Sequence, residues 1–133
     1  MSLWGGVELI DFVDLTLKEK LMVLNWRNSN NIKKWMYSSG LISIENHIGF
    51  IDGLIFSKDR QYMVVKKDNN YLGIVDFTGI DFEKKSSDFG LYANPFEKIS
   101  GVGKILEAVS LKYVFDLLEF KKIKLEVFSN IVK

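Results

Sequence analysis

The chain has 133 residues, of which 47% are hydrophobic and 14% aromatic, and its formal net charge is +1. This is enough apolar material for one domain with one core, and the near-neutral balance does not indicate nucleic acid or an anionic membrane as a partner. The chain has no cysteine and one histidine. Disulfides, thiolate catalysis and cysteine-based metal sites are therefore excluded, a multi-histidine site is remote, and we expect no metal cofactor.

The amino-terminal residues do not have the pattern of a signal peptide, because no cationic stretch leads into a long apolar run. Residues 1–3 are interpreted as a vector-derived extension ahead of the native sequence. No stretch reaches the ~18 apolar residues of a membrane span. We therefore expect a cytoplasmic protein.

The first half of the chain predicts one strand followed by helices. Residues 7–14 have the composition of a strand. Thr16 and Glu19 form a capping-box pattern at the start of a helix. The apolar face expected for this helix consists of Leu17, Leu21 and Leu24. Residues 32–36 fit a short second helix.

A third helix is expected to begin after Ser43, a candidate cap, and to run to about residue 56. Its expected buried stripe consists of Ile48, Ile51 and Ile55. Residues 61–66 and 71–82 are then predicted to form a hairpin, because residues 67–70 have turn chemistry. A polar turn at 83–87 leads to a strand at 88–93, which Pro95 ends because proline cannot donate to a ladder.

The last part of the chain predicts a helix and a strand. The helix is predicted because four apolar residues recur at helical spacing: Leu106, Val109, Tyr113 and Leu117. Residues 122–128 alternate strictly, with Ile123, Leu125 and Val127 on one face. A helix between two strands favours parallel pairing there, whereas the hairpins before it favour antiparallel pairing. The expected fold is therefore α+β, with a mixed and mostly antiparallel sheet flanked by helices in a single domain.

A glycine-rich segment lies between the strand at 88–93 and the next helix, and it consists of Lys98, Ile99, Ser100, Gly101, Val102, Gly103 and Lys104. The first turn of a helix leaves N–H groups unpaired, and the macrodipole favours an anion there. The Gly-Lys-Ser/Thr ending of a Walker loop is absent. The segment follows an antiparallel meander, which argues against a Rossmann dinucleotide site. By itself, it predicts an anion at a helix start, and an ordinary turn is the alternative.

The sequence resembles the GNAT superfamily of N-acetyltransferases at this point. The pattern Lys98-x-x-Gly101-x-Gly103 is similar to the family signature Arg/Gln-x-x-Gly-x-Gly/Ala, with lysine in the first position. The resemblance implies that the amides of this segment, which we call the glycine loop, hold the pyrophosphate of acetyl-CoA. It also implies that the main chain of Leu91, Tyr92 and Ala93 pairs with the pantetheine arm like an added strand.

Further segments resemble the PseH-like sugar-nucleotide N-acetyltransferases of pseudaminic acid biosynthesis. They include Trp26-Arg27-Asn28, Trp35-Met36-Tyr37-Ser38, His47-Ile48-x-Phe50-Ile51 and Leu125-Glu126-Val127-Phe128. This resemblance extends from about residue 15 to residue 133. It implies transfer of acetyl from acetyl-CoA to the 4-amine of a UDP-linked 4-amino-4,6-dideoxy-N-acetyl-β-L-altrosamine for flagellin glycosylation.

The resemblance implies roles for residues in the first two helical segments. Arg27 is expected to bind the nucleotide diphosphate, and the alternative is a solvated arginine at a helix end. Met36 and Tyr37 are expected to line the sugar or uracil pocket, or else to belong to the core. His47 is expected to bind substrate or relay the proton of the amine, and a surface histidine without function is the alternative. Phe50, three residues further on the same helix, is expected to line the same pocket or the core.

Three candidates remain in the later strands. Glu126 is expected to accept the proton of the amine through water, and a solvated glutamate paired with Lys124 or Lys112 is the alternative. Tyr92 is a second candidate for the pocket wall. Asn130 is a candidate contact of the cofactor.

The sequence departs from the family where it ends. The family has a further helix carrying Ala-x-x-x-Tyr and two more strands, and that tyrosine is the usual candidate for protonating the leaving thiolate. We expect the given chain to be truncated after its fifth strand, to be weakly active or inactive alone, and to form a homodimer through an exposed sheet edge.

Two other functions stay open from the sequence. One is a GNAT enzyme that acetylates a protein N-terminus or another small amine. The other is a non-catalytic domain that kept the fold and serves in binding or assembly. Convergence of the Arg27, Met36, Tyr37 and His47 side chains beside the acetyl site would favour the sugar-nucleotide enzyme.

Overall fold

The structure is a computed structural model that describes residues 2–4, 6–33, 41–117 and 122–127. A six-stranded sheet in the order β1-β2-β3-β4-β5-β6 forms its centre. The strands are β1 (Ser2–Trp4), β2 (Val7–Asp11), β3 (Gln61–Lys67), β4 (Asn70–Asp81), β5 (Ser86–Ala93) and β6 (Lys122–Val127). The helical elements are η1 (Phe12–Asp14), α1 (Leu17–Arg27), α2 (Asn30–Lys33), α3 (Ile44–Leu54), α4 (Val102–Lys112) and the π-helical η2 (Tyr113–Leu117).

The sheet is mixed, as the sequence predicts. Neighbouring strands from β1 to β5 are antiparallel, and β5 and β6 are parallel. The turn between β3 and β4 places Asp68 and Asn69 at positive φ, a conformation that Asn and Asp tolerate better than other side chains. The parallel pair requires a crossover, and α4 supplies it.

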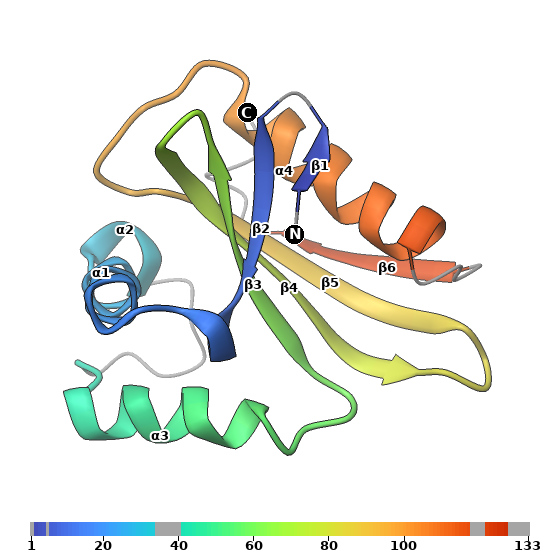
Figure 1. Cartoon of the computed structure of the whole chain (residues 1–133), viewed down its shortest axis with the longest axis horizontal. Helices are drawn as coiled ribbons and strands as arrows, with labels where there is room; N and C mark the ends of the chain where they lie inside the picture. Colours follow the sequence, from blue (N-terminus) through green and yellow to red (C-terminus); the bar gives the residue numbers. More distant parts are fainter. Residues whose placement is uncertain (1, 5, 34–40, 118–121, 128–133) are drawn as a thin grey trace.

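The helices lie in two layers. Helices α1, α2 and α3 cover one face of the sheet, and α4 covers the other (Figure 1). Each face has its own cluster of buried side chains. The cluster under α4 includes Val75, Phe77, Phe89, Leu106 and Val109. The cluster under α1–α3 includes Trp26, Ile51, Val64, Ile74 and Tyr92.

The two predicted helix caps are confirmed. The Thr16 hydroxyl accepts the Glu19 N–H at 3.1 Å, and the Glu19 carboxylate accepts the Thr16 N–H at 2.9 Å. At α3, the Ser43 hydroxyl accepts the Asn46 N–H at 3.1 Å. These bonds satisfy first-turn donors that a helix leaves without partners.

The predicted buried faces of the first two long helices are wrong in part. On α1, Leu17 and Leu21 are 65% and 40% exposed. The residues that α1 buries are Val23, Leu24 and Trp26. On α3, Ile51 is buried as expected, but Ile55 is exposed, and the buried residues are His47, Ile51 and Leu54. The hydrophobic spacing correctly predicted that both segments are helices. Tertiary packing decides which face of each helix turns toward the sheet.

Several predicted boundaries also differ. The first strand ends at Asp11 rather than 14, because its side chain caps the 3-10 turn η1 by accepting the Val13 N–H at 3.1 Å. Helix α3 ends at Leu54 rather than 56. Residues 2–4 pair with β2 as an edge strand that the sequence did not suggest. The long carboxy-terminal helix keeps its predicted face, with Leu106, Val109 and Tyr113 buried.

Gly73 of β4 permits the close approach of three elements. A Cβ built there would overlap the carbonyl oxygen of Tyr92 and would come to 3.0 Å from both the Ala93 Cα and the Leu106 Cδ1. Two of these obstacles are backbone atoms of β5, which cannot turn away as a flexible side chain would. The spacing of β4, β5 and α4 therefore depends on this glycine.

Gly73→Ala is expected to lower the free energy of unfolding by about 1–3 kcal/mol, as overpacking does. Gly49→Ala is the matched control, because a Cβ on this α3 residue meets nothing within 4 Å. It should raise stability by about 0.5–1 kcal/mol through helix propensity. Urea titrations of the three proteins measure both changes. Equal stability of Gly73→Ala and wild type would contradict the close approach.

Candidate active site

The glycine loop ends in a helix start without a side-chain cap. Gly101 is the N-cap of α4 and has φ +74°, which is a left-handed conformation that favours glycine. Its carbonyl accepts the N–H of Ile105 at 3.1 Å as the first bond of the helix. The N–H groups of Gly103 and Lys104 therefore lie in the first turn, where no helical carbonyl reaches them. The predicted helix start at the loop is confirmed. The geometry suits an anion, and the anion itself stays a prediction.

The strand that leads to this loop presents main-chain groups at its end. The Asn94 N–H donates to the Leu72 carbonyl at 2.9 Å, which belongs to the β4 side. Alternation along an antiparallel strand turns the N–H and C=O of Ala93 to the opposite edge. The last described pair between β5 and β6 is Leu91 with Val127. Within the described residues, the main chain of Ala93 thus faces away from β4 at a point past the paired part of β6.

Asn94 fixes the chain as it leaves β5. Its side-chain amide donates to the Tyr71 carbonyl at 3.0 Å, and its side-chain oxygen accepts the Phe96 N–H at 2.9 Å. Tyr71 in turn donates its hydroxyl to Glu19 of α1 at 2.8 Å. Asn94 had no predicted role. The Asn-Pro pair was the available signal, because Asn side chains commonly bond to the backbone two residues further along the chain.

The structure brings Arg27, His47 and Phe50 together between the ends of α1 and α3. Nη1 of Arg27 lies 2.9 Å from Nδ1 of His47. The guanidinium carbon of Arg27 lies 5.0 Å from the centre of the Phe50 ring, within the range of a cation–π contact. Phe50 also meets Tyr62 edge-on at 5.1 Å between ring centres. Arg27 therefore contacts the other two predicted substrate-binding residues, His47 and Phe50.

His47 is fully buried, with 0% of its surface exposed. Its Nε2 lies 2.8 Å from the Lys20 carbonyl oxygen, which can only accept a hydrogen bond. Nε2 therefore carries the proton, and Nδ1 accepts from Arg27. Burial lowers the pKa of His47, and the charges of Arg27 and Lys20 lower this pKa further, against the hydrogen bond to the Lys20 carbonyl. The ring is neutral, and both of its nitrogens are occupied.

The expected proton relay through His47 stays a prediction. A relay needs a ring nitrogen that reaches the substrate amine, and the bonds of both nitrogens to α1 do not favour it. The surface position assumed in the alternative is wrong, because the ring is completely buried.

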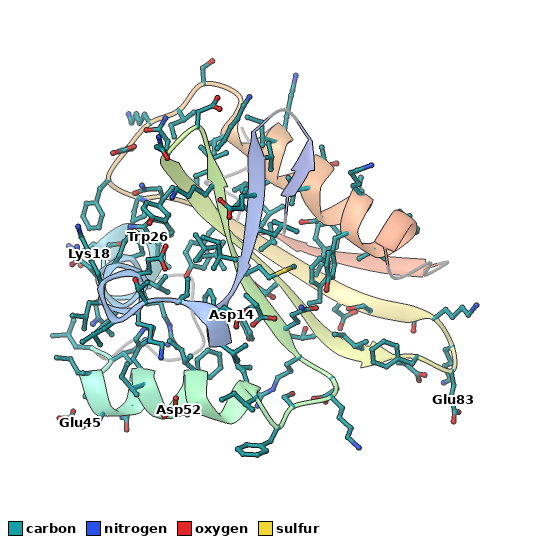
Figure 2. All side chains as sticks on the ribbon, viewed as in Figure 1. Asp14, Lys18, Trp26, Glu45, Asp52 and Glu83 are labelled. Atoms are coloured by element: carbon teal, nitrogen blue, oxygen red, sulfur yellow. The ribbon has the colours of Figure 1, made fainter. Side chains whose placement is uncertain are left out.

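The residues on either side of Arg27 hold the end of α1 in place. Trp26 is buried in the cluster under α1–α3, and Figure 2 shows it on the sheet side of α1, whereas Lys18 lies on the outer side. The Asn28 side chain bonds Ile42 twice, donating to its carbonyl at 3.0 Å and accepting its N–H at 2.7 Å. Asn28 was predicted only as part of a motif. Arg27 therefore lies between a residue that packs in the core and a residue that bonds to the segment before α3.

Tyr92 belongs to the same face as Arg27. Its side chain is buried in the cluster under α1–α3, and the charge of Arg27 acts on its phenol. Burial is the main reason that the pKa of Tyr92 is raised well above its usual range. Tyr92 thus lies in the core cluster on the same face as Arg27, and its role as a pocket wall stays a prediction.

The remaining candidates are placed only in part. The main chain of Glu126 lies opposite Gly90 in the β5–β6 register, and its side chain is outside the described residues. Met36, Tyr37 and Asn130 also lie outside them. The roles of these four residues stay predictions.

Among the described residues, no group of three or more His, Cys, Asp or Glu side chains is placed to hold a metal ion. No helix in the described part of the chain has the length and apolarity needed to cross a membrane.

The lowered pKa of His47 predicts a dependence of stability on pH. In the unfolded chain, His47 takes up a proton as the pH falls below its ordinary pKa of 6.5. The folded protein does not bind this proton until the pH is lower, so acid favours unfolding. The free energy of unfolding should therefore fall as the pH decreases from 7.5 to 5.5. Glu19, whose pKa is also lowered, titrates below 4.5 and does not enter this window.

Urea titrations at three pH values in this window test the prediction, with His47→Gln as the control that lacks the titrating ring. The stability difference between wild type and variant should become smaller with acid. A difference that stays constant from pH 7.5 to 5.5 would show that the ring is not held neutral.

No protein-family model matches the chain. Two Campylobacter jejuni proteins named acetyltransferase PseH are each 33% identical to it over 124 residues, which are 93% of this chain and 76% of theirs. The crystal structure of C. jejuni PseH in complex with acetyl coenzyme A has a TM-score of 0.72 and 31% identity, over 93% of this chain and 78% of that one. A spermidine N-acetyltransferase from Vibrio cholerae, with a TM-score of 0.79, 22% identity, and coverage of 92% and 71%, shares the fold. The identity to the C. jejuni proteins over this share of both chains shows that the chain belongs to the PseH family of GNAT N-acetyltransferases.

Proposed function

We propose that this N-acetyltransferase moves acetyl from acetyl-CoA to the 4-amine of a UDP-linked 4-amino-4,6-dideoxy-N-acetyl-β-L-altrosamine, in the biosynthesis of pseudaminic acid for flagellin glycosylation. The observation that supports a nucleotide-sugar acceptor is the position of the Arg27 guanidinium. His47 and Phe50 hold it on the same face of the sheet as Tyr92. A fixed guanidinium beside an aromatic ring suits a nucleotide diphosphate.

The cofactor side of the proposal rests on main-chain groups. The glycine loop offers first-turn amides of α4 for the pyrophosphate, with exposed Lys98 and Lys104 adding positive charge. The outward-facing N–H and C=O of Ala93 suit the amide groups of a pantetheine arm. A relative of the same family has been solved with acetyl coenzyme A. We assign the main chain of Ala93 and the glycine loop to acetyl-CoA. Leu91 and Tyr92 do not fit the expected main-chain role, because Leu91 pairs with β6 and Tyr92 pairs with β4.

The reaction needs the neutral amine. Its lone pair attacks the thioester carbonyl carbon, the C–N bond forms, the C–S bond breaks, and the amine proton leaves while the thiolate of coenzyme A gains a proton. We propose Glu126 as the base, acting through water. The support is its place opposite Gly90, because a residue without a side chain leaves room beside it for the acceptor. The expected homodimer stays a prediction.

Isothermal titration tests both halves of the site. The chain should bind acetyl-CoA, and it should bind UDP-N-acetylglucosamine as a probe for the nucleotide diphosphate. Spermidine should not compete with the UDP-sugar. Binding of neither ligand would contradict the proposed enzyme and favour a domain used for assembly, whereas displacement by spermidine would favour a polyamine acceptor.

Gly101→Asp and Gly101→Asn form a matched pair at the cofactor loop. Both side chains tolerate positive φ, both can cap α4, and they have nearly the same size. The carboxylate should leave the free protein at least as stable as the amide, because a negative charge suits a helix start. It should nevertheless weaken acetyl-CoA binding about tenfold relative to Gly101→Asn, through repulsion of the pyrophosphate. Equal affinities for acetyl-CoA would place the pyrophosphate elsewhere.

Arg27→Gln tests the acceptor side. Loss of the guanidinium should weaken binding of UDP-N-acetylglucosamine by about tenfold or more and should leave the affinity for acetyl-CoA unchanged. Lys18→Gln, which removes an exposed cation from the same helix, is the control and should change neither affinity. Parallel losses for both ligands in Arg27→Gln would indicate a general structural defect.

A further inference from the structure

The His47 ring connects two consecutive helices through one side chain. It leaves α3 and reaches two groups of α1, the carbonyl of Lys20 and the guanidinium of Arg27. These residues are seven positions apart, which places them on one face of α1, about two turns from each other. A single imidazole therefore links the two helices and also contacts the Arg27 side chain.

The guanidinium is restrained from two directions. A free arginine side chain loses about 2 kcal/mol of rotamer entropy when a ligand fixes it. Here the bond to His47 and the face of the Phe50 ring already hold it in the protein alone. A guanidinium carries five N–H donors, and His47 engages it at Nη1. The edge formed by Nε and Nη2 is the one that could meet two oxygens of a diphosphate.

We propose that His47 is a positioning residue, which as a neutral ring with its proton on Nε2 holds Arg27 ready for the nucleotide diphosphate and does not itself contact the ligand. This inference rests on the proposed function for the diphosphate, but the bond between the two residues does not depend on that function.

The proposal predicts that ligand affinity changes with pH in the opposite direction from that expected of a histidine that binds phosphate directly. A second proton would sit on Nδ1 and face the Nη1 donor, so the bond to Arg27 would be lost. The charges that act on the ring from α1 are Arg27 and Lys20, both cationic. On α3, Glu45 and Asp52 are both exposed, whereas the His47 ring is buried, and neither carboxylate is among the groups that act on the pKa of His47. Figure 2 labels both residues. Acid should therefore release the guanidinium and weaken the binding of an anion, whereas a histidine that binds phosphate directly would strengthen binding on protonation.

The first test needs no ligand. His47 is the single histidine of the chain, so its ring nitrogens can be read by ¹⁵N NMR without assignment. The expected spectrum at pH 7 is that of a neutral ring protonated on Nε2, with a pKa below 6.5. Arg27→Gln should move this pKa upward, because it removes one of two adjacent cations. A ring protonated on Nδ1, a cationic ring, or a pKa unchanged in Arg27→Gln would overturn the proposal.

The second test uses two variants of His47. His47→Asn keeps an acceptor near Nδ1, while His47→Gln keeps an N–H donor near Nε2 and loses the acceptor. UDP-N-acetylglucosamine is the probe, because its disubstituted diphosphate does not titrate between pH 5.5 and 7.5. His47→Asn should retain most of the affinity, and His47→Gln should lose about tenfold. Both should bind acetyl-CoA like wild type.

The pH profile completes the test. Affinity of wild type for the UDP-sugar should fall between pH 7.5 and 5.5, and this fall should be absent in His47→Asn. Equal losses in both variants, or tighter binding in acid, would show that His47 binds the ligand directly. If wild type does not bind the UDP-sugar at all, the proposed function fails, and the NMR titration of Arg27→Gln alone decides whether His47 holds Arg27.

Discussion

A histidine can be completely buried between two helices only if both of its ring nitrogens find partners, and α1 meets this condition for His47. One nitrogen donates to a main-chain oxygen and the other accepts from Arg27. The consequence is a cation at the end of α1 whose position is set by the core rather than by solvent. This contact links α3 to α1, and together with the Phe50 ring it restrains the direction of Arg27.

Strand β5 connects the acceptor side and the cofactor side of the proposed site. Its strand β5 carries Tyr92, which packs on the face covered by α1–α3, and continues to Ala93 and the glycine loop, which begins α4 on the other face. In the proposed site, the main chain supplies the cofactor contacts, which any sequence with the right backbone can provide. Side chains supply the proposed acceptor contacts, so the same fold can serve different amines when these side chains change.

The sequence predicted much of the fold because its local rules agree with one another. The capping box at Thr16, the turn before β4 and the glycine at the start of α4 are local features, and the structure contains all of them. The mixed sheet followed from the order of elements. The orientation of α1 could not be predicted, because exposed Leu17 and Leu21 are as hydrophobic as the residues that it buries.

The sequence indicated which residues of the candidate site lie together, but not how they are bonded. The resemblance indicated Arg27, His47 and Phe50 together, and the structure brings them into contact. Periodicity could not reveal that the single histidine would occupy the buried stripe of α3, since a polar residue there depends on partners from another helix. Nor could it reveal Asn28, Asn94 or Gly73, whose roles arise from contacts with the main chain of distant segments.

Transfer of acetyl to the amine of a nucleotide sugar is the central claim, and a single-turnover reaction tests it most directly. The chain, in excess over a UDP-linked 4-amino-4,6-dideoxy sugar, is mixed with acetyl-CoA and the sugar is analysed by mass spectrometry. The account predicts a sugar heavier by one acetyl group, with the new group on the 4-nitrogen. An unchanged sugar in the presence of bound acetyl-CoA, together with acetylation of spermidine or of a peptide amino terminus, would contradict it.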